Sequence, residues 1–182
     1  MTLRCRFTRL LAALFSVALA TPATAESLAD SPPKYCQVRT TDYRLTAAVE
    51  TGVRESATFR QLVDRINASD VVVYVTADPS ELPSGVDGQL TFLSATGGFR
   101  YVVVRVNVKL SPPRLVSLLG HELQHAREIA DTEAIVDSPS MARAYAGRLG
   151  YHNRDDTDRS MFDSVAAIRA GERVLKEVLS GE

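Results

Sequence analysis

The sequence predicts an α+β fold with one globular domain. Apolar positions recur at helical spacing over residues 43–67, the segment 71–108 is rich in β-branched residues, and helical spacing returns from Ser111. Because helices, a small sheet and further helices follow one another in blocks, alternating βαβ units are not expected. The length of 182 residues suits one domain once a targeting segment is removed.

The N-terminus has the pattern of a secretory signal peptide. Three arginines precede an apolar stretch over residues 10–20, and the small residues 23–25 (ATA) offer a cleavage site. An uncleaved anchor helix is the alternative, but an apolar stretch of about 11 residues falls short of the roughly 20 that span a bilayer. We therefore expect residues 1–25 to be a signal peptide and the protein to be exported, to the periplasm or the extracellular space. A loose mature N-terminus over residues 26–42 and a domain over residues 43–182 are expected to follow.

The mature chain is expected to be acidic and to lack a membrane span. Loss of the three arginines lowers the 21 basic residues to 18 against 22 acidic ones, a net charge of −4, which argues against nucleic acid as a partner. No apolar run of about 18 residues follows the N-terminus. Cys36 becomes the single cysteine, for which we expect a buried thiol or an intermolecular disulfide rather than a catalytic role.

Two helices and three strands are expected between residues 43 and 108. The helical pattern of residues 43–67 is interrupted, so the second helix is expected to begin near Ala57 with Ser56 as its N-cap. The expected strands are residues 71–75, 89–95 and 99–108, separated by segments rich in proline or glycine.

Three helices are expected after the sheet. Ser111 and the two prolines that follow it suit a helix start, because the first turn of a helix leaves its N–H groups without partners. This helix is expected to run to about Ala130, and further helices fit residues 139–149 and 161–179. In the strand expected over residues 99–108, alternate valines share a core face, whereas the opposite face is half polar.

One motif carries the chemistry: His121-Glu122-Leu123-Gln124-His125, inside the helix that starts after Ser111. Positions i and i+4 lie on one helix face, so His121 and His125 are placed to bind one zinc ion. Glu122 lies beside the first histidine, where it can accept a proton from a water whose pKa is lowered by zinc. The alternative interpretation is a pair of surface histidines on an ordinary amphipathic helix.

The segment 119–125 (LGHELQH) resembles the active-site helix of zincin metallopeptidases, and the element order resembles that of small secreted gluzincin-like bacterial proteins. The resemblance extends over roughly residues 57–179 in element order, while only the HELQH helix is specific at the level of residues. It implies a minimal zincin-like fold, His121 and His125 as zinc ligands, and Glu122 as general base. The chain departs from the metzincin pattern, because His125 is not followed by the glycine and third histidine which that pattern requires.

The resemblance also implies a third zinc ligand, an acid on a later helix just ahead of small residues. Asp163 in the segment 161–167 (MFDSVAA) suits this position, with aspartate in place of the usual glutamate, and the shorter side chain would need a closer approach of the two helices. The alternative role for Asp163 is a capping box with Ser160. Other candidate ligands are Glu133, the main rival, and the weaker Asp131 and Asp137.

Four more residues are candidates for supporting roles. Glu128 lies on the helix face of the two histidines but too far along the axis to join the first ligand, so a contact to a ligand rather than to the metal is expected. His152, Tyr151 and Tyr145 are candidate donors to the oxyanion of a tetrahedral intermediate. For His152 the alternative is an ordinary loop position, and for Tyr145 it is a place in the core.

The sequence therefore predicts a zinc-dependent peptidase that hydrolyses a peptide or protein substrate, with the half-polar face of residues 99–108 pairing with an extended substrate. The alternative is a non-catalytic zinc-binding scaffold or binding protein on a zincin-like fold, because the small size leaves little room for a deep cleft. Glu122 separates the two hypotheses, since a structural zinc site has no use for an acid at that position.

Overall fold

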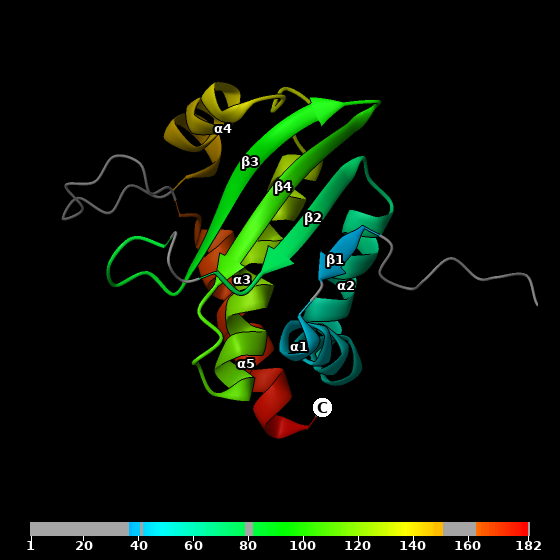
Figure 1. Ribbon diagram of the computed structural model, residues 1–182, viewed down its shortest axis with the longest axis vertical. Coiled ribbons are helices and arrows are strands. Elements are labelled where there is room, and N and C mark those ends of the chain that lie inside the picture. Colours follow the sequence, from blue (N-terminus) through cyan, green and yellow to red (C-terminus); the bar gives the residue numbers. More distant parts are fainter. Residues whose placement is uncertain (1–36, 41, 79–81, 151–162, 182) are drawn as a thin grey trace, which may run out of the picture. The chain divides into compact units, whose positions relative to one another are not determined.

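A computed structural model describes residues 37–40, 42–78, 82–150 and 163–181. The elements are β1 (Val38–Thr40), α1 (Tyr43–Glu55), α2 (Ala57–Asn67), β2 (Val71–Thr76), β3 (Gly88–Thr96), β4 (Phe99–Val106), α3 (Pro112–Ala130), α4 (Ser138–Ala144), the π-helix η2 (Tyr145–Leu149) and α5 (Val165–Ser180). The expected α+β class is confirmed (Figure 1). None of the helices within the described residues has the length and apolar content needed to span a bilayer.

The strands form one mixed sheet in the order β1-β2-β4-β3. The pairs β1–β2 and β2–β4 are parallel, and β3 pairs antiparallel with β4. The expectation of three strands is wrong, because β1, inside the segment 26–42 expected to be loose, pairs with Val73–Val75 of β2. A strand of three residues is too short to show a recognisable period, so only its partner strand identifies it.

The hairpin between β3 and β4 turns at Gly97 and Gly98. Thr96 pairs with Phe99, which leaves these two glycines as the loop, and their φ angles are 61° and 80°. Positive φ at both central positions is the requirement of a type I′ turn, whose twist matches that of the flanking strands. The hairpin makes β3 an edge strand of the sheet and places β4 in its interior.

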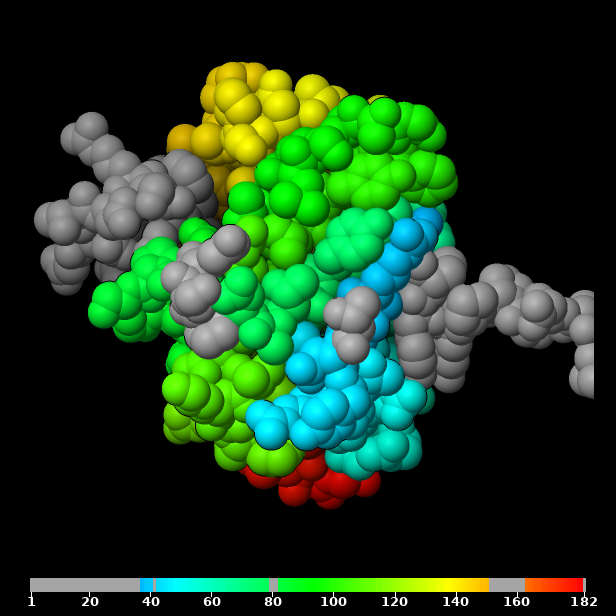
Figure 2. Space-filling view, viewed as in Figure 1, coloured from blue at the N-terminus to red at the C-terminus, as the bar shows by residue number. Residues whose placement is uncertain are grey.

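Helices cover one face of the sheet, and α3 lies directly behind it in the view of Figure 1. On this face the alternate valines Val102, Val104 and Val106 are fully buried, as expected. On the opposite face Tyr74 and Tyr101 stack with ring centroids 6.4 Å apart, and side chains of the four strands reach the surface in Figure 2. The core therefore lies between the sheet and the helices.

Local sequence signals set the ends of the first two helices. The Asp42 carboxylate accepts hydrogen bonds from the first amides of α1, and the Ser56 hydroxyl caps α2 as predicted, accepting from the Phe59 amide at 3.0 Å. Ser56 also donates to the Glu177 carboxylate of α5, at 2.5 Å. The start of α2 is thereby attached to the C-terminal helix.

The last helices depart from their expected boundaries. The single helix expected over residues 139–149 is α4 followed by the π-helix η2, which closes with a bond from the Gly150 amide to the Tyr145 carbonyl of 2.9 Å. The helix expected from residue 161 begins at Val165, because Ser164 has an extended backbone (φ −128°) and caps the first turn. Ser160, the expected partner of Asp163 in a capping box, lies outside the described residues.

Arg100 of β4 joins the sheet to the C-terminal end of α3. Its guanidinium is buried and donates to the carbonyls of Ile129, Thr132 and Ile135 at 2.7, 2.9 and 3.1 Å. Its other nitrogens pair with both carboxylate oxygens of Asp70, which lowers the pKa of that carboxyl. The carbonyls of Ile129 and Thr132 also accept backbone amides, from Thr132 and Ile135, so Arg100 adds a second donor at the end of α3 and ties the turn that follows it to the sheet.

Replacing Arg100 with methionine should destabilise the fold strongly. The change removes a buried donor from the Ile129 and Ile135 carbonyls and the ion-pair partner from Asp70, and we expect a loss of about 3 kcal/mol in the free energy of unfolding. Urea denaturation with an unchanged m-value would measure it. The matched control is Arg54→Met, which breaks an exposed pair with Glu55 and should cost less than about 1 kcal/mol. Equal losses in the two variants would contradict the role given to Arg100.

Candidate metal centre

His121 and His125 lie one turn apart on α3 and face the same space. Their ring centroids are 4.9 Å apart with an interplanar angle of 80°. The side chain of His125 is 8 % exposed, whereas that of His121 is 23 % exposed, so the pair lies at the rim of the core rather than on an open helix face. This placement argues against the interpretation of two surface histidines.

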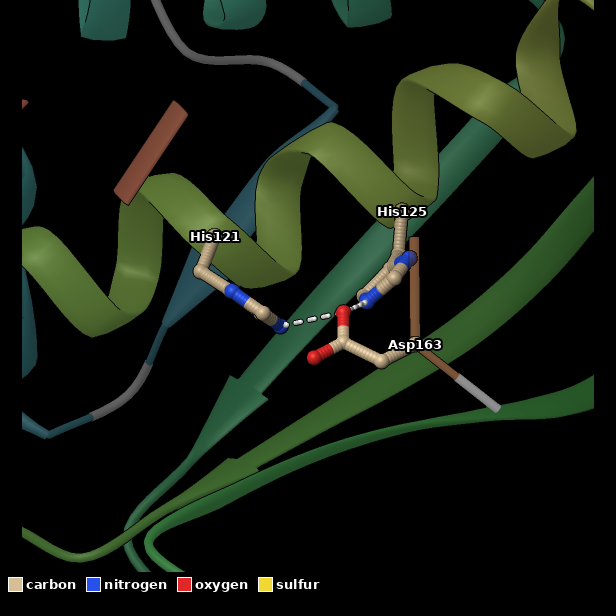
Figure 3. A group of neighbouring side chains, drawn as sticks. All are labelled: His121, His125 and Asp163. Carbon is tan, nitrogen blue, oxygen red and sulfur yellow. Dashed lines mark ion pairs between the residues drawn. The ribbon is translucent and has the colours of Figure 1, made fainter. Parts of the chain in front are cut away.

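Asp163 completes a group of three possible metal ligands. Its Oδ1 atom lies 3.4 Å from Nε2 of His121 and 3.5 Å from Nε2 of His125, and all three ligand atoms lie within 4.8 Å of one another (Figure 3). Two ligand atoms at 2.0–2.1 Å from a tetrahedral zinc ion are about 3.3 Å apart, so the two short distances fit that geometry. Asp163, one of the candidate third ligands, follows His125 by nearly forty residues in the sequence, and the structure brings it together with both histidines.

The other acidic candidates for the third metal ligand lie outside this group. Glu133 is exposed and does not belong to the group, nor do Asp131 and Asp137. Asp131 forms an ion pair with Arg65 at 2.6 Å, and the Asp137 carboxylate accepts a hydrogen bond from the Ser140 amide at the start of α4. Among the described acids, Asp163 is therefore the one placed to bind a metal together with both histidines.

Glu128 contacts the His125 ring at Nδ1, the nitrogen that faces away from the other two candidate ligands. Its Oε2 atom lies 3.0 Å from Nδ1 of His125 and accepts a hydrogen bond of 2.8 Å from the Tyr145 hydroxyl. Its Oε1 atom accepts a bond of 2.6 Å from the Ser164 hydroxyl. An ionised carboxylate only accepts, so Nδ1 carries a proton, while Nε2 faces Asp163 and offers a lone pair to a metal only after losing its own proton. The expected contact of Glu128 to a ligand is thereby found.

The same contacts give Tyr145 a different role from the expected one. Its hydroxyl is buried against Glu128 and lies 3.1 Å from Nδ1 of His125, behind the ring rather than in front of Nε2. In this position it orients a candidate ligand and is not a donor to an oxyanion. The other candidate donors, Tyr151 and His152, lie outside the described residues, as does Cys36.

Glu122 is a buried carboxyl that takes no part in the ligand group. Its side chain is inside the protein, and burial raises its pKa to about 7, with Asp163 adding to the rise and His125 opposing it. A Cβ atom added to Gly88, the first residue of β3, would lie 2.8 Å from Oε1 of Glu122. The carboxyl therefore packs directly against the backbone of the edge strand, which no sequence signal revealed.

The histidines have opposite pKa shifts. Burial lowers the pKa of His121, and the neighbouring His125 lowers it further. Burial also acts to lower the pKa of His125, but hydrogen bonds to Asp163 and Glu128 and the charges of Glu122 and Glu128 outweigh it and raise the value to about 9. The surroundings of His125 thus favour a positive charge at this position, which a bound cation would replace.

The chain matches no protein-family model, no curated protein and no solved structure with which it was compared. The site is therefore defined by its own geometry: the HxxxH pair on α3 and Asp163 before α5 form a possible metal-binding group, and Glu122 follows the first histidine of the pair.

Replacing Glu128 with glutamine should weaken metal binding while the fold is retained. The amide loses the charge that orients His125 and adds donors where Tyr145 and Ser164 already donate, so we expect Zn²⁺ affinity to fall about 10- to 100-fold. Competition with a chromophoric chelator would measure the affinity. Glu172→Gln, the same change at an exposed position of α5, serves as the control. An unchanged affinity in Glu128→Gln would refute the orienting role.

Proposed function

We propose that the protein is a zinc-dependent peptidase of zincin-like architecture in which Glu122 acts as the general base. The observation that carries the proposal is a buried carboxyl directly beside a group of three possible ligands without being one of them. A catalytic zinc site has three protein ligands and one open position, whereas a structural site uses four. Within the described residues the group has three members, which supports the catalytic type.

Zinc is the metal that suits the donor set best. Two imidazole nitrogens and one carboxylate oxygen are ligands typical of catalytic zinc, while magnesium and calcium prefer oxygen ligands throughout. The short spacing of Asp163 Oδ1 to both Nε2 atoms supports a compact tetrahedral site. His121, His125 and Asp163 would hold the ion.

The chemistry follows from the positions of the protein's own groups. Zinc, when bound, supplies a Lewis acid that lowers the pKa of water towards about 7. Glu122 would take the proton from that water and then deliver it to the leaving amine. Glu128, with its own pKa lowered despite burial, stays ionised and keeps His125 in the tautomer that presents Nε2.

The edge strand β3 is the better place for an extended substrate. The sequence predicts substrate pairing along residues 99–108, but β4 is bonded to β2 on one side and to β3 on the other, so its backbone groups are already used. Among the described strands β3 pairs with β4 alone, and its first residue, Gly88, packs against Glu122. A peptide that adds a strand to β3 would pass beside the proposed base.

Export remains part of the proposal. The N-terminal pattern of residues 1–25 predicts a signal peptide, and a peptidase that acts in the periplasm or outside the cell would fit it. N-terminal sequencing of the protein secreted from an expression host would test cleavage after Ala25.

Replacing Glu122 with glutamine tests the proposal directly. Zinc content should stay at one ion per chain, because Glu122 is not a ligand, while hydrolysis of a diverse peptide library should fall about 10²- to 10⁴-fold. Metal analysis and mass spectrometry of the cleaved library give the two readouts. Glu133→Gln, at the exposed rival position, is the matched control and should retain both properties.

Two outcomes would contradict the proposal. Equal cleavage rates for wild type and Glu122→Gln would remove the general base from the mechanism. If the zinc-loaded wild type cleaved nothing in the library, the non-catalytic zinc-binding scaffold would be favoured instead.

Replacing Gly88 with alanine should reduce hydrolysis without removing zinc. The added methyl group would come within 2.8 Å of the Glu122 carboxylate and 2.7 Å of Leu118, so the carboxylate must move. We expect kcat to fall by at least about 10-fold, since the position of a general base decides its efficiency. Kinetics on any substrate identified in the library, together with zinc analysis, would check this. Loss of zinc with unchanged kcat per bound ion would point to a different role for Gly88.

A further inference from the structure

Helix α5 passes unusually close to α3 at the level of the first histidine. A Cβ atom added to Gly171 of α5 would lie 3.2 Å from Cβ of His121 and 3.3 Å from the carbonyl oxygen of Ser117. The Gly171 carbonyl in turn accepts a hydrogen bond of 2.9 Å from the Ser117 hydroxyl. The backbone of α5 thus lies directly against the base of a candidate metal ligand.

A second glycine, on α3, also lies where the two helices are in contact. A Cβ atom added to Gly120 of α3 would lie 2.8 Å from Cγ2 of Val174 on α5. Glycine inside a helix destabilises it relative to alanine, so a glycine at the contact of both helices needs a reason in the packing. Here the reason is visible, because a methyl group at Gly120 would overlap Val174 and one at Gly171 would press against the backbone of α3 and the Cβ atom of His121.

The separation of α3 and α5 also decides how long the side chain of an acid before α5 must be to approach the two histidines. Ser164 is bonded to Glu128 of α3, and Gly171 is bonded to Ser117, so α5 is attached to α3 at two points along its length. Asp163 precedes the first of these points and its Oδ1 atom lies 3.4 Å from Nε2 of His121. Glutamate at this position would extend about 1.3 Å further, the length of one methylene, and would overshoot.

We propose that Gly171 is a positioning residue of the metal centre: it sets the separation of α3 and α5 at which an aspartate, rather than a glutamate, completes the ligand group. The proposal rests on the metal site of the proposed function but not on peptide hydrolysis. It predicts that the helix separation and the length of the acid at position 163 are coupled.

A double-mutant cycle tests the coupling by metal affinity alone. Zn²⁺ and Co²⁺ binding would be measured for the full mature chain as wild type, Gly171→Ala, Asp163→Glu and the double variant. Each single change should weaken binding about 10- to 100-fold, as changes around metal ligands commonly do. The double variant should bind at least about 10-fold more tightly than the product of the single effects, because the longer acid spans the wider gap. The visible spectrum of the Co²⁺ form should change in Gly171→Ala and return towards that of wild type in the double variant.

The control separates positioning from a general effect of adding a methyl group to a helix. Gly147→Ala is the matched change, since a Cβ atom there meets nothing within 4 Å among the residues that the structure describes. It should leave metal affinity unchanged. Thermal unfolding of the metal-free proteins should show Gly171→Ala folded with nearly the stability of wild type, because alanine favours the helix while the contact to His121 opposes it.

Several outcomes would overturn the proposal. Additive effects in the cycle, or wild-type affinity in Gly171→Ala, would show that the helix separation does not govern the ligand. If Gly171→Ala failed to fold, Asp163→Glu alone would decide. Equal or tighter zinc binding by Asp163→Glu would contradict the proposal, because the proposal requires the shorter side chain of aspartate at position 163. If the cycle showed coupling but the wild type cleaved no peptide, the positioning role of Gly171 would stand and the peptidase proposal would be rejected. If the wild type cleaved peptides but the cycle were additive, the peptidase proposal would stand and the positioning role would be rejected. A wild type that binds neither ion would reject both.

Discussion

The buried carboxylate of Glu128 is the constraint on which the candidate metal centre depends. A charge inside a protein is tolerated only where hydrogen-bond donors surround it, and the donors to Glu128 come from three separate segments of the chain. His125 belongs to α3, Tyr145 begins the π-helix and Ser164 caps α5. Satisfying this one group therefore fixes a ligand ring, closes a helix against α3 and brings Asp163, the neighbour of Ser164, to the histidines.

Glu122 and Glu128 show how the same residue type acquires opposite properties on one helix. Both carboxyls are buried, but Glu128 has several donors that lower its pKa, whereas burial dominates at Glu122 and raises its pKa. A carboxyl that stays ionised is suited to orient a ligand, and one that titrates near neutrality is suited to exchange protons. The two roles thus follow from the neighbours of each side chain, not from its position in the HELQH motif alone.

Helix α3 is held along its whole length by groups that are remote in the sequence. Arg100 donates to carbonyls at its C-terminal end, the sheet covers its apolar face, and α5 packs against the turn that carries His121. Side chains that are fixed in this way lose little further freedom when they bind a ligand, so a site built on them is preorganised. The same rigidity makes the separation of α3 and α5 a quantity to which the metal group is sensitive.

The α+β class, the Ser56 cap, most strand positions and the HELQH pair could be predicted from the sequence, because these depend on short-range periodicity and on one helical turn. Asp163 was also named, but its proximity to the histidines depends on where α5 meets α3. Four features could not be predicted in this way: the fourth strand β1, the interior place of β4, the contact of Gly88 with Glu122, and the hydrogen bonds of Tyr145 and Ser164 to Glu128. Each of these joins segments that are far apart in the chain, and spacing along a sequence carries no information about such distances.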